Sequence, residues 1–317
     1  MTSLARSPRV HEELRPPSVA VVSPDGSSIG DDALGGLASL PCVVVGDGYD
    51  QRTPPAHVDV VVDRAVAGLD DILATVEANP IAATTLALLL RGSTGRSLAE
   101  GLVAESAAYS VLQAGREFQR WRDANTAKQR TAELEPPVLA ERGGNVLRVA
   151  LNRPHVRNAL NRAMRDALLD ALALAAADGT ITRVELRGNG PVFSSGGDLD
   201  EFGTFDDPAS AHLVRLAASL ARSYAAVADR LVVSLHGACA GSGIELPAFA
   251  HRVVAAPGTT FALPEVGLGL IPGAGGTVSL TRRVGRHRMA LLALAGTAVD
   301  AATALAWGLV DEIGQVD

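Results

Sequence analysis

Two glutamates that could do acid–base chemistry, Glu245 and Glu265, lie 20 residues apart, and each adjoins glycine-rich sequence. Two carboxyl groups that converge on a partly dehydrated pocket cannot both ionise freely, so one of them is expected to hold a proton. Glycine-rich turns follow predicted strands at 194–198, 237–243 and 267–276. Such turns can direct main-chain N–H groups at an oxygen that gains charge during a reaction. The combination predicts proton transfer beside a stabilised oxyanion.

The elements that must hold these segments alternate between strands and helices. Short apolar runs bounded by turn residues predict strands at 145–151, 181–187 and 231–235. Apolar residues at helical spacing predict helices at 161–177 and 212–230. This alternation is typical of parallel sheets, in which the loops at the strand ends are natural ligand sites. We therefore expect an α/β domain whose chemistry lies in its loops.

Four motifs follow one another over residues 145–317. They are Leu151-Asn-Arg-Pro154 with Asn158-Ala-Leu160, Phe193-Ser-Ser-Gly-Gly-Asp198-Leu199, His236-Gly-Ala-Cys-Ala-Gly-Ser-Gly-Ile-Glu-Leu246, and Phe261-Ala-Leu-Pro-Glu-Val-Gly-Leu-Gly-Leu-Ile-Pro-Gly-Ala-Gly-Gly-Thr277. In this order they resemble the crotonase superfamily, the family of enoyl-CoA hydratases and isomerases. The resemblance implies the fold class α/β, with a crotonase-like ββα spiral core and an N-terminal α/β-plus-helical extension.

The resemblance also implies a site and an activity. In this family the thioester carbonyl of an acyl-CoA lies between two backbone N–H donors, which correspond to Gly197 and Ser242. Glu245 and Glu265 match the two glutamates of the hydratases. Glu245 would deprotonate the water that attacks Cβ, and Glu265 would deliver a proton to Cα. The implied enzyme is an enoyl-CoA hydratase, a lyase of fatty acid metabolism that adds water syn to a 2-enoyl-CoA through an enolate.

Further substrate contacts are implied around the two oxyanion loops. Ser195, Asp198 and Gly241 are expected to bind the acyl-CoA, and Arg157 occupies a position that is often basic for CoA binding. Ser242 stands where the family usually has glycine; its N–H survives, but its Cβ restricts φ and could narrow the pocket. No metal and no cofactor are expected, because coenzyme A is part of the substrate and backbone donors with proton transfer suffice.

Other interpretations of the same residues stay open. In the isomerases of the family, a glutamate at the position of Glu265 often shuttles the proton alone. A cofactor-independent aryl-acetyl-CoA dioxygenase would reuse the oxyanion hole, and residues 98–113 loosely resemble the helical extension of the dihydroxyphenylacetyl-CoA dioxygenases. A noncatalytic acyl-CoA-binding protein would keep the fold, although loss of one or both glutamates would be its signature. Without the motifs, Glu245 would be an ordinary residue of a helix N-terminus and Glu265 a solvated loop acid.

The chain is predicted to divide into an N-terminal extension, residues 1–140, and a catalytic domain, residues 141–317. The extension should contain strands at 18–23, 41–46 and 58–63, helices at 69–90, broken at Asn79-Pro80, and at 97–121, and a polar linker at 123–144. Crotonases usually continue with C-terminal helices that cover the acyl-CoA site, and this sequence is expected to lack them. We expect the helices at 97–121 to pack there instead.

Composition sets limits on partners. The 317 residues are 47% hydrophobic but only 3% aromatic, which suits two modules or one large domain with an aliphatic core. A net charge of −7 without a block of Lys and Arg argues against binding to nucleic acid or an anionic membrane. Cys42 and Cys239 lack metal or disulfide spacing, and residues 1–10 lack a signal core, so a cytoplasmic protein is expected. The resemblance implies a homo-oligomer, a trimer or hexamer.

Overall fold

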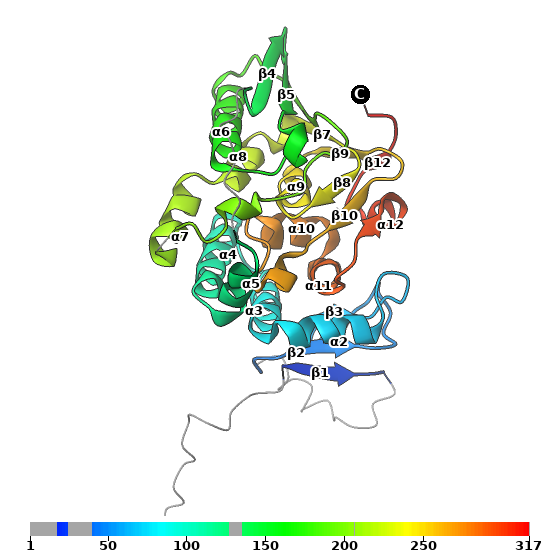
Figure 1. Ribbon diagram of the computed structural model, residues 1–317. Helices are drawn as coiled ribbons and strands as arrows, with labels where there is room; N and C mark the ends of the chain where they lie inside the picture. Colours follow the sequence, from blue (N-terminus) through cyan, green and yellow to red (C-terminus); the bar gives the residue numbers. More distant parts are fainter. Residues whose placement is uncertain (1–17, 25–39, 127–134, 206, 317) are drawn as a thin grey trace, which may run out of the picture.

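The computed structural model of the protein describes residues 18–24, 40–126, 135–205 and 207–316. The prediction made for residues 1–10 and the centre of the predicted linker lie outside these ranges. Within them, the chain forms a small N-terminal sheet, a group of four helices and a larger α/β body (Figure 1).

The N-terminal sheet consists of three parallel strands in the order β1-β2-β3. They are β1 (Val19–Val22), β2 (Val43–Gly46) and β3 (Val60–Val61). All residues of β2 and β3 are buried, which agrees with their continuous apolar sequence. The three predicted strands of the extension are therefore confirmed.

Four helices follow this sheet: α2 (Leu69–Ala78), α3 (Pro80–Arg91), α4 (Leu98–Gln113) and α5 (Arg116–Ala124). α2 and α3 meet at 110°, at the predicted Asn79-Pro80 break, because proline suits the first turn of a helix but not its interior. Across the described ranges, no single helix has both the length and the apolar composition needed to cross a membrane. Only α2 and α3 counted together, as a bent pair, meet that test.

The larger body is built on a six-stranded sheet in the order β12-β9-β7-β6-β5-β4, which is parallel except for β4. Its strands are β4 (Val138–Gly143), β5 (Val146–Leu151), β6 (Arg183–Gly188), β7 (Leu231–Leu235), β9 (Arg252–Ala255) and β12 (Glu312–Ile313). The predicted linker at 123–144 is wrong over β4, and the predicted boundary between residues 140 and 141 falls inside this strand. Only Val138 of β4 is buried, so this edge strand shows no alternation of apolar residues.

A three-stranded sheet, β11-β10-β8, and seven helices complete the body. The strands are β8 (Ala238–Ala240), β10 (Thr260–Ala262) and β11 (Val299–Asp300), and the helices are α6 (Arg162–Ala177), α7 (Pro208–Ala217), α8 (Leu220–Ala226), α9 (Ser242–Glu245), α10 (Gly276–Val284), α11 (Arg286–Leu294) and α12 (Ala301–Trp307). The single helix predicted at 212–230 is wrong. The chain leaves helical geometry at Ala218, and Ser219 caps a new helix, α8, so the apolar spacing continues across a break.

The N-terminal helices and the larger body share one hydrophobic core. Ile72, Leu86 and Leu102 belong to the same buried cluster as Ile271 and Leu291. Helix α4 packs against α3, α5, α7 and α10 (Figure 1). Because the extension and the body bury their apolar faces against each other, neither half presents its share of the core to solvent.

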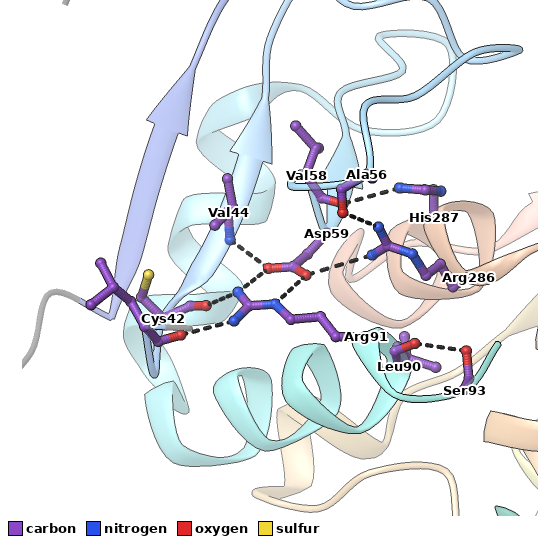
Figure 2. A network of polar contacts seen from close by, with 11 residues as sticks. Cys42, Val44, Ala56, Val58, Asp59, Leu90, Arg91, Ser93, Arg286 and His287 are labelled. Carbon is purple, nitrogen blue, oxygen red and sulfur yellow. Dashed lines mark hydrogen bonds and ion pairs between the residues drawn. The ribbon is translucent and has the colours of Figure 1, made fainter. Parts of the chain in front are cut away.

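A buried ion pair joins the N-terminal sheet to this core (Figure 2). Asp59 is 3% exposed; its Oδ2 lies 2.6 Å from Arg91 Nη2 and also accepts the N–H of Val44 at 2.8 Å. From α11, Arg286 Nη2 donates to the carbonyl of Ala56 at 2.6 Å, and its Nη1 lies 3.7 Å from Asp59 Oδ1. The network thereby ties strand β2 and the approach to β3 to helices α3 and α11.

We expect Asp59→Ala to lower the free energy of unfolding by about 3–5 kcal/mol, because it leaves the guanidinium of Arg91 buried without its carboxylate. Urea unfolding followed by circular dichroism measures the change. Arg64→Ala is the control, since it breaks a pair with Asp47 in which Arg64 is 70% exposed. That control should cost about 1 kcal/mol or less. Equal losses in the two variants would contradict the stabilising role of the Asp59 network.

Candidate active site

A cavity of about 260 Å³ brings together most of the residues that the sequence singles out. Gly197, Ser242, Glu245 and Glu265 all line it. Side chains from α4 and α7 complete its wall: Tyr109, Gln113, Ala211 and Arg215. A larger cavity of about 920 Å³ lies over strands β4 to β7 and is lined by none of the predicted site residues. The smaller cavity is therefore the candidate active site.

The first oxyanion loop, residues 194–198, is held by a buried asparagine. Asn158 has a left-handed φ of 52° and no exposed surface. Its Nδ2 donates to three carbonyl oxygens at 2.8–3.1 Å, those of Asn189, Val192 and Phe193. Side-chain amides of this kind replace the regular ladder of hydrogen bonds that a loop lacks. The approach to the loop is consequently fixed before any substrate binds.

A buried ion pair and an aromatic contact fix the far end of the same loop. Asp198 Oδ2 lies 3.1 Å from Arg153 Nη1, and neither side chain is more than 4% exposed. The ring of Phe202 packs over Gly197, where a Cβ would overlap it. Trp121 of α5 contacts this ring, with 6.4 Å between centroids. The extension thus supports the backbone that carries the N–H of Gly197.

The second oxyanion loop, residues 237–243, requires glycine at position 241. Gly241 has a left-handed φ of 50° and is the N-cap of α9, where its carbonyl accepts the N–H of Glu245 at 2.9 Å. A Cβ at this position would overlap Oε1 of Glu265. Any other residue would therefore be strained in its backbone and would displace a carboxylate.

Two backbone amides in the cavity wall have no acceptor among the residues that the structure describes. Among the hydrogen bonds of the described residues, neither the N–H of Gly197 nor that of Ser242 is used as a donor. Both residues line the cavity that contains Glu245 and Glu265. Donors that are fixed in advance and shielded from water are the arrangement that stabilises an oxyanion. The two amides are therefore the candidate donors to an oxygen placed in this cavity.

Glu245 is 2% exposed, and one of its oxygens is held by the backbone. Its Oε2 accepts the N–H of Ala274 at 2.8 Å and the N–H of Gly276 at 2.9 Å, at the start of α10. Burial raises the pKa of this carboxyl well above its usual value, and the charges of Glu265 and Glu105 raise it further. The two N–H donors oppose the rise because they stabilise the carboxylate.

Glu265 is 7% exposed and lies at the start of a 3-10 turn, Glu265–Leu268. Its Oε2 is buried and has no hydrogen-bond partner in the described part of the chain. Burial raises its pKa from 4.5 to about 8, and the nearby charge of Glu105 contributes to the increase. An oxygen without a donor favours the neutral acid, so Glu265 is suited to hold a proton near pH 7.

The sequence of residues 141–317, more than half of the chain, matches the model of a family described as enoyl-CoA hydratase/isomerase. The 2,3-dehydroadipyl-CoA hydratase of Escherichia coli (strain K12) is 36% identical over 176 residues, which cover 56% of this chain and 68% of that protein. The chain belongs to the enoyl-CoA hydratase/isomerase family. It spans about two thirds of the length of the curated relatives that it matches.

Members of this family with different names are similarly close. The trans-2-decenoyl-[acyl-carrier-protein] isomerase of Streptococcus mutans is 33% identical, over 56% of this chain and 68% of that protein. The crystal structure of an enoyl-CoA hydratase from Thermoplasma volcanium GSS1 has a TM-score of 0.53 and 34% identity, over 57% of this chain and 72% of that one. The predicted crotonase fold is confirmed over this part of the chain. Membership of the family does not separate hydration from isomerisation.

Three of the residues predicted to bind the acyl-CoA lie apart from the reacting groups or are used within the protein. Ser195 and Arg157 do not line the cavity; the N–H of Ser195 donates to the carbonyl of Arg157 at 2.9 Å, and the side chain of Arg157 is exposed. Asp198 lines the cavity, but its carboxylate binds Arg153. The CoA-binding roles of these residues stay predictions of the enoyl-CoA hydratase/isomerase resemblance.

Three residues in or beside this cavity were not identified from the sequence: Glu105, Tyr109 and Arg215. Arg215 of α7 contacts two residues of α4. Its Nη1 donates to Gln113 at 3.0 Å, and its guanidinium lies 4.8 Å from the ring centroid of Tyr109. A signal for Glu105 was present, because it interrupts the apolar face of α4. That face contains Leu98, Leu102, Tyr109 and Leu112 at helical spacing.

The raised pKa of Glu265 predicts how stability depends on pH. The folded protein keeps a proton on this carboxyl up to about pH 8, whereas the unfolded chain releases it above about pH 4.5. The free energy of unfolding should therefore fall as the pH rises from about 5 to about 8, because the unfolded state binds fewer protons. Urea unfolding at a series of pH values measures this. Glu265→Gln should reduce the fall, whereas Glu77→Gln, at an exposed position on α2, should not. A wild-type stability that rises over this pH range would contradict the prediction.

Proposed function

We propose that the protein is an enoyl-CoA hydratase, which adds water syn across the double bond of a 2-enoyl-CoA thioester. One observation carries the proposal: two buried glutamates and two unused backbone amides line the same cavity. The amides suit a thioester oxygen, and the glutamates suit the two carbon atoms next to it. The name of the E. coli relative, 2,3-dehydroadipyl-CoA hydratase, supports the same chemistry.

The amides of Gly197 and Ser242 would bind the thioester oxygen as the enolate forms. Attack at Cβ moves electrons through Cα to this oxygen, which gains negative charge. Each preorganised donor of this kind lowers a barrier by about 2.7–4 kcal/mol in enzymes where one donor has been removed. The contribution grows in a cavity that excludes water, because the effective dielectric constant is lower there.

The hydrogen bonds around the two glutamates divide their roles. Two N–H donors stabilise the carboxylate of Glu245, whereas Oε2 of Glu265 has no donor among the described residues. Glu245 is therefore the base that takes a proton from water while the oxygen of that water bonds to Cβ. Glu265 gives its proton to Cα. The product gains one H and one OH, and transfer of the proton from Glu245 to Glu265 restores the starting state.

Isomerisation of the double bond is a second candidate function, which the acyl-carrier-protein isomerase from S. mutans supports at nearly equal identity. In that reaction a proton leaves Cα of a 3-enoyl thioester and returns to Cγ, so the double bond moves next to the carbonyl and no water is added. Glu265 alone could carry it. The two reactions differ in their need for Glu245, so the same variants distinguish them. Either reaction uses only groups of this chain, with coenzyme A as part of the substrate.

We expect Glu245→Gln and Glu265→Gln each to lower the hydration rate by about 10²-fold or more, because each removes one proton-transfer group. Loss of the enoyl-thioester absorbance of crotonyl-CoA and of 2,3-dehydroadipyl-CoA measures hydration, and Glu77→Gln is the control. Near-normal hydration by both variants would remove the proposed roles. If Glu245→Gln keeps wild-type turnover of a 3-enoyl-CoA while Glu265→Gln loses it, the enzyme is an isomerase. Consumption of dioxygen with an aryl-acetyl-CoA in place of hydration would contradict both reactions.

A further inference from the structure

Glu105 is a third buried carboxylate beside the candidate active site, and it belongs to α4 of the N-terminal extension. Helix α4 packs against α10 (Figure 1). Glu105 is only 2% exposed. Its Oε1 accepts the N–H of Gly275 at 2.7 Å, and its Oε2 accepts the N–H and the hydroxyl of Thr277 at 2.9 and 2.6 Å. Both oxygens are therefore fixed by donors at the N-terminus of α10.

Glu245 binds the same stretch of backbone through the amides of Ala274 and Gly276. Four successive amides, 274–277, thus alternate between a carboxylate of the extension and a carboxylate of the proposed catalytic pair. The first turn of a helix has N–H groups without intrahelical acceptors, and the helix dipole favours negative charge there. A displacement of this turn would move the hydrogen-bond donors of both glutamates together.

The charges that face Glu105 do not neutralise it. In the described part of the chain, no Lys, Arg or His forms a salt bridge with it. Burial raises the pKa of Glu105 to about 7, opposed by the donors of Gly275 and Thr277 and by the charge of Arg215. In return, the charge of Glu105 raises the pKa of three groups that face it: Glu245, Glu265 and Tyr109. On α7, His212 binds Ser106, the residue after Glu105.

We propose that Glu105 is a positioning residue of the active site. It fixes the first turn of α10 and, through the amides of that turn, holds the carboxylate of Glu245 in the cavity. Glu105 lines an adjoining cavity of about 190 Å³ and does not line the one that contains Gly197, Ser242 and Glu265. It therefore acts through α10 without touching the reacting atoms, and the extension becomes a working part of the catalytic centre.

Glu105→Gln in the full chain tests the proposal, and its activity measurement rests on the proposed function. In the carboxamide, an NH₂ group replaces one of the two carboxylate oxygens. This group cannot accept the hydrogen bonds that the oxygen accepts, so the contact of one oxygen with α10 is lost. We expect kcat/KM for crotonyl-CoA to fall about 10- to 100-fold, the loss typical when a group that orients a functional side chain is removed. The dependence of kcat/KM on pH should be bell-shaped, with a rising and a falling limb that report the pKa values of the base and the acid. Both limbs should move to lower pH, because the loss of a negative charge lowers the pKa of Glu245 and of Glu265. A folded variant with unchanged rate and limbs would overturn the proposal.

Thr277→Val is a second variant, chosen because it preserves side-chain shape and leaves every residue of the carboxylate cluster in place. It removes the hydroxyl that donates to Glu105 and so favours the neutral form of that carboxyl. The limbs should therefore shift in the same direction as in Glu105→Gln, but less. A shift to higher pH would overturn the proposal.

Glu117→Gln is the matched control. Glu117 is also a buried glutamate of the extension, and its carboxylate accepts the N–H groups of Ile81 and Ala82 at 2.9 Å, at the N-terminus of α3. This variant should lower stability, because the cap is lost, and should leave the limbs of the pH profile where they are. An equal shift in Glu117→Gln would show that the effect comes from weakened packing of the extension, and the proposal would fail.

A measurement without substrate separates this proposal from the proposed function. The free energy of unfolding at pH 8 is compared for Glu105→Gln, Glu245→Gln and the double variant. The two single effects should fail to add, because the residues share four successive amides and repel each other. Effects of Glu117→Gln and Glu245→Gln should add. Non-additive effects without hydratase turnover would support the role of Glu105 and contradict the proposed function. Additive effects, together with hydratase turnover and unmoved limbs, would contradict the role of Glu105 and support the proposed function.

Discussion

Four successive backbone amides at the start of α10 constrain both halves of this molecule. Residues 274–277 begin a helix in the interior, where each unsatisfied N–H would cost about 1–3 kcal/mol. Glu245 and Glu105 satisfy all four. The glycines of this segment allow the two carboxylates to come close: a Cβ on Gly276 would overlap the side chain of Glu245. The stability of the helix start and the orientation of the proposed base therefore depend on the same contacts.

The donors also determine how three neighbouring carboxyl groups differ. Burial raises the pKa of Glu105, Glu245 and Glu265, and their mutual repulsion makes full ionisation of all three unfavourable. Both oxygens of Glu105 and one oxygen of Glu245 accept N–H bonds, whereas Oε2 of Glu265 is buried and has no donor in the described ranges. These hydrogen bonds favour the proton on Glu265, whereas burial and the charge of Glu265 also raise the pKa of Glu245 well above its usual value. In the proposed mechanism, this asymmetry of backbone hydrogen bonds is what distinguishes the acid from the base in a pair of identical side chains.

The sequence by itself determined the elements and the motif residues, because both depend on neighbours along the chain. Valine runs identified the strands of the extension, Asn79-Pro80 located the bend between α2 and α3, and the four motifs identified the family. Predictions from local sequence were wrong where the pattern of apolar residues did not match the observed element. Strand β4 has one buried residue and no alternation, and the apolar spacing of α7 runs on into α8 across a break that Ser219 caps.

Only the tertiary structure decided which groups meet. Glu105 and Thr277 are 172 residues apart, and nothing in the spacing of either one names the other. A glutamate on an apolar helix face signals a buried partner, but the partner depends on which element packs opposite, a choice made by the whole core. The same holds for the unused amides of Gly197 and Ser242 and for the outward side chain of Arg157. Periodicity determines which side chains share a face, whereas long-range packing determines what that face contacts.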